Sequence, residues 1–413
     1  MKAVSKGIWI VASLSLSLAV VFATGSYWAE SSTEQSPAPP AEHVMDAIHG
    51  NVKTEATREL TPNPMFLPGF PQLVPLAGRS RDMGEIYVKG LYVSSWTAGT
   101  KRIQEFIQLA KQKEINALVI DLKDSTGKIC YESNVPLVQE LKLQERRIRD
   151  LDALVRECKK AGIYLIARIA VFQDPALAEK RPEWAIKSKE KGTLWRDKKG
   201  LAWVDPSVRK IWEYNVAIAR EAIEKGFDEI NFDYIRFPTD GKMDDLAYPH
   251  WDSTRPKYEN MKAFFEYIDK EVRSQGVFLS VDLFGLTTWQ KDDLNIGQRL
   301  IDAAGHVDYI CPMVYPSHYP SGFLGYKNPA LYPYEVVYKS IAKGMETIKG
   351  TGTKIRPWLQ DFDIGADYDS HKIMLQKKAV YDANAYGWLM WNARNVYTLG
   401  GLEPKGNKDG VRG

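Results

Sequence analysis

Between residues 89 and 393, short apolar runs of strand length alternate with longer segments whose apolar residues recur at helical spacing. The apolar runs are nearly continuous, which is typical of parallel strands buried on both faces. Eight strands are predicted, at 89–96, 117–124, 164–172, 229–238, 278–285, 308–316, 355–362 and 386–393. Amphipathic helices are predicted between them, at 100–113, 145–161, 206–225, 255–274, 292–304, 333–348 and 369–384.

Eight strands that alternate with helices over about 300 residues predict an α/β fold of the (β/α)8 TIM barrel type. The alternative is an open doubly wound sheet, but such a sheet does not require eight regular strand–helix repeats. The connections that leave strands include the long ones, at 125–144, 173–205, 239–254 and 317–332. Long loops therefore gather on the C-terminal face, where barrel enzymes place their chemistry.

The N-terminus carries a targeting pattern, because Lys2 and Lys6 precede a long apolar stretch without a charged residue. The stretch is either a cleaved signal peptide or a retained membrane anchor, since its length is near the ~20 residues that span a bilayer. The lysines stay on the cytoplasmic side, so we expect a secreted or membrane-anchored protein at the cell surface or outside the cell. The chain is thus divided into a signal or anchor segment, a Pro-rich spacer, the barrel and a tail, at 1–29, 30–84, 85–400 and 401–413.

Charge and cysteine content exclude several classes of function. A net charge of +3, from 55 basic and 52 acidic residues, gives no case for nucleic-acid binding. The three cysteines are too scattered for a disulfide scaffold or a zinc site. No P-loop, dinucleotide fingerprint or His-Glu-x-x-His motif occurs in the sequence, so we expect no cofactor and no metal. A metal-dependent hydrolase is the alternative, and it would use Asp121 with His250 or His318.

Strand alternation directs polar side chains into the predicted barrel. Asn231 and Asp233 lie on the face opposite Ile230, Phe232 and Tyr234, and the apolar set must meet the helices. The same alternation predicts further inward side chains on other strands: Asp121, Lys123, Arg168, Ser280, Asp282, Arg356, Trp358, Gln360, Trp388 and Asn392. Six of the eight strands would thereby deliver polar groups to one mouth.

Three inward aspartates, Asp121, Asp233 and Asp282, suggest either a scaffold or a catalytic site. As a scaffold they would pair with Lys123, Arg168 and Arg236. Their common position at strand ends favours catalysis. Two carboxylates about 5 Å apart hydrolyse glycosides with retention, whereas a gap of about 6.5–9.5 Å admits water and gives inversion. Asp233 and Asp282 lie on neighbouring strands, so either spacing is within reach.

Seven sequence blocks resemble the bacterial putative glycosyl hydrolase domain family, whose members are glycosidase-like barrels of unknown specificity. The blocks are GLYVS from Gly90, VIDLKD from Val119, FDEINFDYIRFP from Phe227, SVDLFG from Ser280, PMVYPSHY from Pro312, PWLQDF from Pro357 and GWLMWNA from Gly387. The resemblance implies a secreted or surface-attached barrel. It also implies that Asp233 is a nucleophile, as in retaining glycosidases of the α-amylase and α-galactosidase kinds. The sequence departs from the amylase pattern with Asn231 in place of an arginine and Asp282 in place of a glutamate.

The sequence as a whole predicts a glycoside hydrolase that acts on a cell-wall or extracellular polysaccharide. Asp233 would attack the anomeric carbon, and Asp282 would protonate the leaving oxygen. Arg236 and Asn231 would keep Asp233 ionised. The expected substrate-binding residues are Asp121, Arg168, Asn231, Arg236, Tyr315, His318, Trp358, Gln360, Asp361, Trp391 and Asn392. The alternative function is a non-catalytic barrel that binds glycans and scaffolds the cell surface.

Overall fold

The computed structural model describes residues 86–406. The expected signal or anchor segment, the Pro-rich spacer and the last residues of the expected tail lie outside this range. Among the described residues, no helix is long and apolar enough to cross a bilayer.

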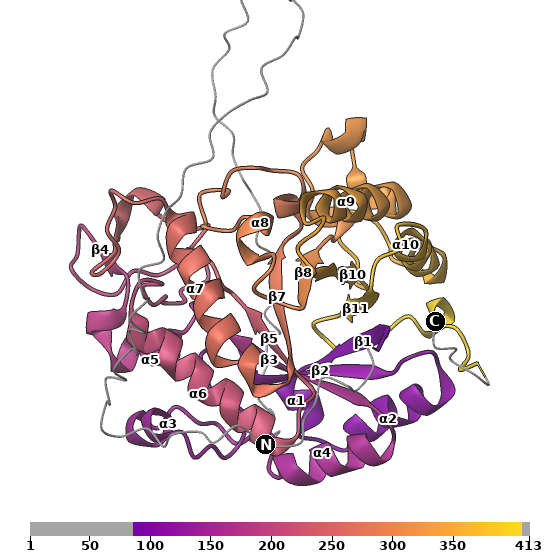
Figure 1. The fold of residues 1–413 in the computed structure, drawn as a ribbon, viewed down its shortest axis with the longest axis horizontal. Coiled ribbons are helices and arrows are strands. Elements are labelled where there is room, and N and C mark those ends of the chain that lie inside the picture. The colour runs from indigo at the N-terminus through magenta and orange to yellow at the C-terminus, as the bar shows by residue number, and fades with distance from the viewer. Residues whose placement is uncertain (1–85, 407–413) are drawn as a thin grey trace, which may run out of the picture. The chain divides into compact units, whose positions relative to one another are not determined.

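Eight parallel strand positions close into a barrel, as predicted (Figure 1). The strands are β1 Val88–Val93, β2 Ala117–Lys123, β3 Tyr164–Ala170, β5 Glu229–Asp233, β7 Phe278–Phe284, β8 Tyr309–Met313, β10 Trp358–Gln360 and β11 Gly387–Trp391. The sheet closes where β8 pairs with β10, with Met313 opposite Trp358. A short strand, β9 (Lys354–Ile355), also pairs with β8. It directly precedes β10, and the two short strands together form the seventh strand of the barrel. Pro357 separates β9 from β10, because proline has no backbone N–H to donate to a ladder.

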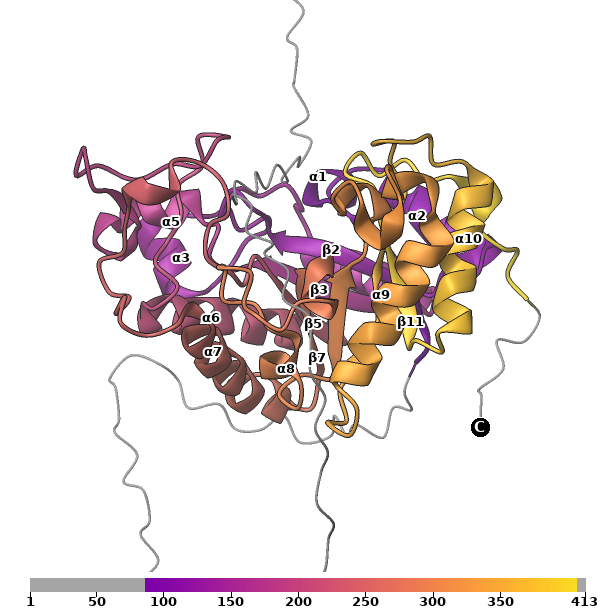
Figure 2. The ribbon, with the colours of Figure 1, turned by 90° about the horizontal axis from the view of Figure 1, so that it is seen from above.

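Long helices surround the barrel, and Figure 2 shows α6 and α7 outside the strands on one side and α9 and α10 on the other. The helices are α1 Ser95–Ala98, α2 Ile103–Gln112, α3 Pro136–Leu141, α4 Leu151–Lys160, α5 Pro175–Lys180, α6 Arg209–Lys225, α7 Lys257–Glu271, α8 Leu300–Ala303, α9 Pro333–Thr347 and α10 Ser370–Asp382. Six of the seven predicted helices are present with somewhat different ends. The long loops after β3 and β5 are joined by an antiparallel pair, β4 (Lys187–Ser188) and β6 (Leu246–Ala247).

The helix predicted at 292–304 is wrong over most of its length, since only α8 is helical there. The side chains of Asp292 and Asp293 accept hydrogen bonds from the backbone N–H groups of Leu294 and Asn295. Leu294 and Asn295 both have positive φ, at 52° and 56°. Short polar side chains that bond the local backbone in this way favour turns over helices.

Two expected inward side chains point elsewhere. A register shift between Asp121 and Lys123 interrupts the pairing of β2 with β3. The Lys123 ammonium lies 2.7 Å from Asp174 and donates to Asn215 of α6, so it is part of a buried network outside the barrel interior. Trp388 packs toward α10, where its indole donates to the Tyr381 hydroxyl, because the neighbouring Leu389 takes the interior position.

The entry end of the barrel contains a buried ion pair. Glu229 and Arg356 are fully buried and lie in contact, with a second guanidinium nitrogen donating to Glu229 at 3.1 Å. Asp228, the neighbouring acid, accepts from the Leu165 backbone and pairs with Lys159 at the surface. These two acids therefore contribute to stability at the face opposite the long loops.

Candidate active site

Arg168 of β3 forms the centre of a buried carboxylate cluster in the barrel interior. Its Nη1 donates to Asp121 Oδ1 at 2.5 Å, and its Nε donates to Asp233 Oδ2 at 3.1 Å. The same Nε lies 3.9 Å from Asp282 Oδ2. Burial alone would lower the pKa of Arg168, but the charges of Asp233 and Asp121 outweigh it and raise the pKa well above its usual value. One guanidinium thus connects the three aspartates singled out in the sequence.

Asp233 is the most accessible of these carboxylates. Its side chain is 10% exposed, compared with 4% for Asp121 and 2% for Asp282. Asp233 ends β5, and its Oδ1 accepts the N–H of Tyr234 at 2.6 Å. Tyr234 has a positive φ of 52°, which turns the chain away from the strand at this point. The turn leaves the carboxylate at the mouth of the barrel.

Asp282 of β7 lies deeper and accepts its hydrogen bonds from neutral donors. Its Oδ1 accepts from Trp358 Nε1 at 2.8 Å and from Asn231 Nδ2 at 2.9 Å. Burial, followed by the charge of Asp233, raises the pKa of Asp282 to about 8. The side chain therefore keeps its proton at neutral pH, as a general acid must.

The spacing of Asp233 and Asp282 follows from their shared contact with Arg168 Nε. Distances of 3.1 and 3.9 Å to that atom place the two Oδ2 oxygens within about 7 Å of each other. This bound is compatible with either two-carboxylate geometry of glycoside hydrolysis.

Asp121 holds Arg168 in place. Its second oxygen accepts from the Tyr92 hydroxyl at 2.6 Å, so both carboxylate oxygens have protein partners. Burial is the main cause that raises the pKa of Asp121, and the Arg168 charge opposes it. Tyr92 was not predicted as a site residue, although it occupies the mouth end of β1 and alternation could have found it.

Neither of the two residues expected to keep Asp233 ionised forms a hydrogen bond with it. Asn231 donates to Asp282 and to Ser280 Oγ instead. Arg236 donates to the Phe237 carbonyl and the Thr239 hydroxyl, and it forms no ion pair with Asp233. Arg168 takes the role expected of Arg236, because β3 pairs with β5 and brings Ala170 opposite Asp233.

Aromatic side chains surround the carboxylate cluster. Trp391 stacks on Tyr92 with ring centroids 3.9 Å apart and meets Trp358 edge-on at 5.6 Å. Tyr315, after β8, lies edge-on to His318 at 5.2 Å. Burial, then the charges of Asp282 and Asp233, raises the pKa of the Tyr315 hydroxyl. Burial lowers the pKa of His318 to about 4, so this imidazole is neutral at pH 7.

Three expected sugar-binding residues, Gln360, Asp361 and Asn392, have their polar groups engaged within the protein. Gln360 accepts from Ser317 and donates to the Phe362 carbonyl. The carboxylate of Asp361 accepts from Thr398, and Asn392 donates to the carbonyl of Asp361. These contacts favour a role in fixing the loops after β8, β10 and β11 over direct contact with a sugar.

Within residues 86–406, no three His, Cys, Asp or Glu side chains are grouped as metal ligands would be. His250 lies next to the Glu183 carbonyl, and His318 lies next to Ser317.

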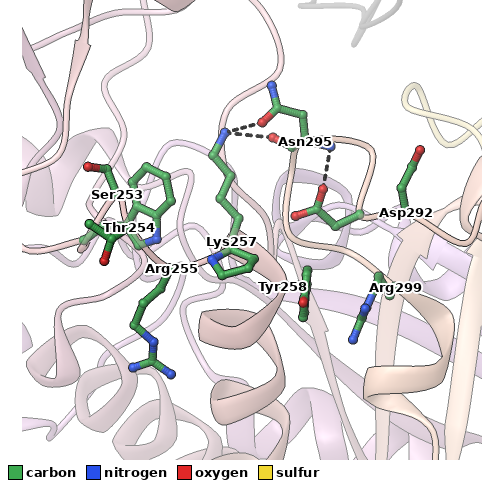
Figure 3. A pocket seen from close by; sticks show the side chains of 11 residues that line it. Ser253, Thr254, Arg255, Lys257, Tyr258, Asp292, Asn295 and Arg299 are labelled. Carbon is green, nitrogen blue, oxygen red and sulfur yellow. Dashed lines mark hydrogen bonds between the residues drawn. The ribbon is translucent and has the colours of Figure 1, made fainter.

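A separate hollow of about 380 Å³ lies between the loops after β5 and β7 (Figure 3). The Lys257 side chain points to Asn295 and donates to its carbonyl and amide oxygens at 2.9 Å. Arg299 lies 3.6 Å from the centroid of the Tyr258 ring and pairs with Asp302. The charged groups of this hollow are largely partnered within the protein, which makes it a weaker candidate for chemistry than the carboxylate cluster.

Comparisons with known proteins agree with the barrel. The model of a putative glycosyl hydrolase domain family matches residues 90–397. The glycoside hydrolase domain of PgaB (BpsB) from Bordetella bronchiseptica is 13% identical, with a TM-score of 0.54 over 74% of this chain and 94% of that chain. A hypothetical protein from Ruminiclostridium thermocellum is 37% identical, with a TM-score of 0.43 over 50% of this chain and 98% of that chain. No curated protein matches the chain.

Proposed function

The chain belongs to the putative glycosyl hydrolase domain family, and from this premise we propose that it hydrolyses a cell-wall or extracellular polysaccharide with two carboxylates. The observation that carries the proposal is the contrast between Asp233 and Asp282, which lie within about 7 Å of each other and share Arg168 unequally. Asp233 accepts hydrogen bonds from the Arg168 guanidinium, whereas Asp282 lies 3.9 Å from it, accepts its hydrogen bonds from the neutral groups of Trp358 and Asn231, and has a pKa of about 8. Such a divergence assigns the base or nucleophile to one residue and the acid to the other.

In the proposed reaction, an oxygen of Asp233 forms a bond with the anomeric carbon while the glycosidic C–O bond breaks. Asp282 transfers its proton to the leaving oxygen. Asp282, now ionised, then takes a proton from a water molecule as the water oxygen bonds to the anomeric carbon and the C–O bond to Asp233 breaks. Arg168 stabilises the ionised Asp233 before and after the covalent step.

The polysaccharide class is supported by the aromatic side chains and by the expected export segment. The half-buried ring of Trp391 meets Trp358 edge-on beside Arg168, and flat apolar rings suit the faces of sugars. A signal peptide or membrane anchor at 1–29 would bring the barrel to glycans outside the cytoplasm.

Replacing Asp233 by Asn tests the proposal. The variant should lose at least about 100-fold in activity, since it removes the nucleophile but preserves the shape of the side chain. The measurement is the release of reducing ends from purified wall and capsular polysaccharides. Asp228→Asn is the matched control, because Asp228 lies at the other end of the same strand pair and contacts Lys159. Equal activity of Asp233→Asn and wild type would refute the assignment.

The ion-pair network itself favours a second candidate, a barrel that binds glycans without cleaving them. Arg168 contacts both Asp121 and Asp233, as a purely structural network would. This alternative expects no reducing ends from any polysaccharide with the wild type, and equal glycan binding by the wild type and Asp233→Asn.

A further inference from the structure

Arg236 is a buried cation without a carboxylate partner. Its side chain lies just beyond β5, and the residue is only 4% exposed. Among the described residues, no carboxylate oxygen lies within 4.0 Å of its guanidinium, whereas Arg168 and Arg356 each contact at least one. Burial lowers the pKa of Arg236, and nearby charges only partly offset this. A desolvated guanidinium is unfavourable unless an acceptor compensates for the lost water.

Aromatic rings and one set of hydrogen bonds fix the orientation of this guanidinium. Its central carbon lies 4.8 Å from the ring centroids of Trp203 and Phe284 and 5.6 Å from that of Tyr234. Nη1 donates to Phe237 and Thr239. Within residues 86–406, Nε and Nη2 have no hydrogen-bond acceptor, and neither is among the fully enclosed polar atoms that lack a partner. The free edge of Arg236 is therefore the Nε–Nη2 edge, and it retains a small exposed surface.

The Nε–Nη2 edge carries two parallel N–H donors, which match the two oxygens of a planar carboxylate. The neighbouring protein acids do not supply that carboxylate. Asp197 accepts from Trp203 Nε1 and from two backbone N–H groups. Asp240 influences Arg236 electrostatically but forms no ion pair with it. The geometry thus leaves room for a carboxylate from a ligand.

The position of Arg236 links it to the carboxylate cluster. Phe284 follows Asp282 by two residues on β7, so both occupy the same face of that strand at successive levels. Tyr234 directly follows Asp233, and the charges of Asp233, Arg168 and Arg236 all act on its hydroxyl. A glycan that reaches Asp233 would therefore place a neighbouring group within reach of Arg236.

We propose that Arg236 binds the carboxylate of an acidic sugar and that the substrate is an acidic glycan. The carboxylate belongs either to a uronic acid or to a lactyl ether such as that of N-acetylmuramic acid. This inference rests on the proposed function for the identity of the reaction, but its test measures binding alone.

The test measures binding of two matched pairs of probes to the full chain carrying Asp233→Asn, which prevents cleavage of the probes. Tetragalacturonate is compared with its methyl ester. A tetrasaccharide of alternating N-acetylglucosamine and N-acetylmuramic acid is compared with chitotetraose. One acidic probe should bind at least about tenfold more tightly than its neutral partner, as expected for a bidentate arginine–carboxylate contact. The pair that shows the preference identifies the source of the carboxylate.

Substitutions at Arg236 separate recognition from folding. Arg236→Gln should abolish the preference by weakening the binding of the acidic probe at least about tenfold. Arg236→Lys keeps the charge but not the fork, so it should retain part of the preference and serves as the second test if the glutamine variant unfolds. Arg299→Gln is the matched control, because Arg299 also packs on an aromatic ring but is already paired with Asp302.

Equal binding of acidic and neutral probes, absence of binding to either acidic probe, or an undiminished preference in the folded Arg236 variants would overturn the inference. The outcomes also separate it from the proposed function. A wild type that cleaves no glycan but shows the Arg236-dependent preference refutes only hydrolysis. A wild type that cleaves a neutral glycan without any such preference refutes only the role of Arg236.

Discussion

At the scale of single residues, Asp282 determines how the site should respond to pH. Its proton is the one that the proposed reaction delivers to the leaving group, and its pKa is about 8. Activity should therefore fall as pH rises through about 8, because the ionised side chain has no proton to donate. The check is a pH profile of kcat/KM between pH 5 and 10 on the substrate found by the screen, since this ratio reports the pKa values of the free enzyme. A flat profile between pH 7 and 9 would contradict Asp282 as the acid.

The same residue should lower stability at alkaline pH. The folded pKa of Asp282 lies above the value of about 3.9 in an unfolded chain, so folding is favoured while the proton is bound in the native state. This contribution is fully present below pH 4 and is lost as pH rises toward 8. Asp282→Asn should remove this dependence of stability on pH. The free energy of unfolding of the variant minus that of wild type should therefore be on the order of 2 kcal/mol larger at pH 8 than at pH 6. Urea unfolding of both proteins at pH 6 and pH 8 measures these free energies. An equal change from pH 6 to pH 8 in wild type and variant would contradict the assignment to Asp282.

The sequence predicted that Arg236 acts on Asp233, whereas Arg168 is the arginine that contacts it, which shows how far the site could be predicted from sequence. Alternation correctly directed Asp233 and Asp282 inward, because side-chain direction in a strand is a local property. Which guanidinium meets Asp233 depends on the register of β3 against β5, which no local pattern encodes. Similarly, Gln360 and Asp361 have side chains typical of sugar ligands, but folding engages them with Ser317 and Thr398.

At the scale of elements, the ion pair of Glu229 and Arg356 joins β5 to the segment before β10 across the barrel interior. Glu229→Ala would leave a buried guanidinium without a counter-charge and should lower the free energy of unfolding by about 3–5 kcal/mol. The double variant Glu229→Leu, Arg356→Met removes both charges and should be clearly less destabilised. Urea unfolding of both variants tests this, and a double variant no better than the single one would show that the pair is not the cause.

Strands were predicted better than helices because a parallel barrel strand is buried on both faces and reads as an apolar run. The failed helix at 292–304 contains apolar residues at suitable spacing, but Asp292 and Asp293 bind the local backbone and turn the chain. The register shift between β2 and β3 that redirects Lys123 could not be predicted from the sequence either, because a bulge adds a residue without changing composition.

At the scale of the whole molecule, residues 401–405, at the start of the expected tail, pack against the barrel domain. Lys377 donates to the Gly401 carbonyl, the Glu403 N–H donates to Glu114, and Leu402 is buried. Lys405 also donates its N–H to the Gln112 carbonyl at the end of α2. These contacts connect the end of the described chain to both α2 and α10.

A chain truncated after Gly400 should consequently melt about 5 °C below the full chain, since it loses the buried Leu402 side chain and uncovers the buried Glu114–Lys377 pair. A chain truncated after Gly406 keeps every contact named above and serves as the control. Differential scanning calorimetry compares the three proteins. Equal melting temperatures would show that these contacts do not contribute to stability.

The sharing of Arg168 among three aspartates also sets the charge of the site. Asp121, Asp233 and Asp282 all lie around the single guanidinium of Arg168, so acids outnumber bases in this cluster. Glycosidic bond cleavage passes through a sugar ring with oxocarbenium character and therefore gains positive charge. A site with excess negative charge favours that ring over the neutral substrate. The unequal number of acids and bases around Arg168 thus becomes a means of selecting the transition state.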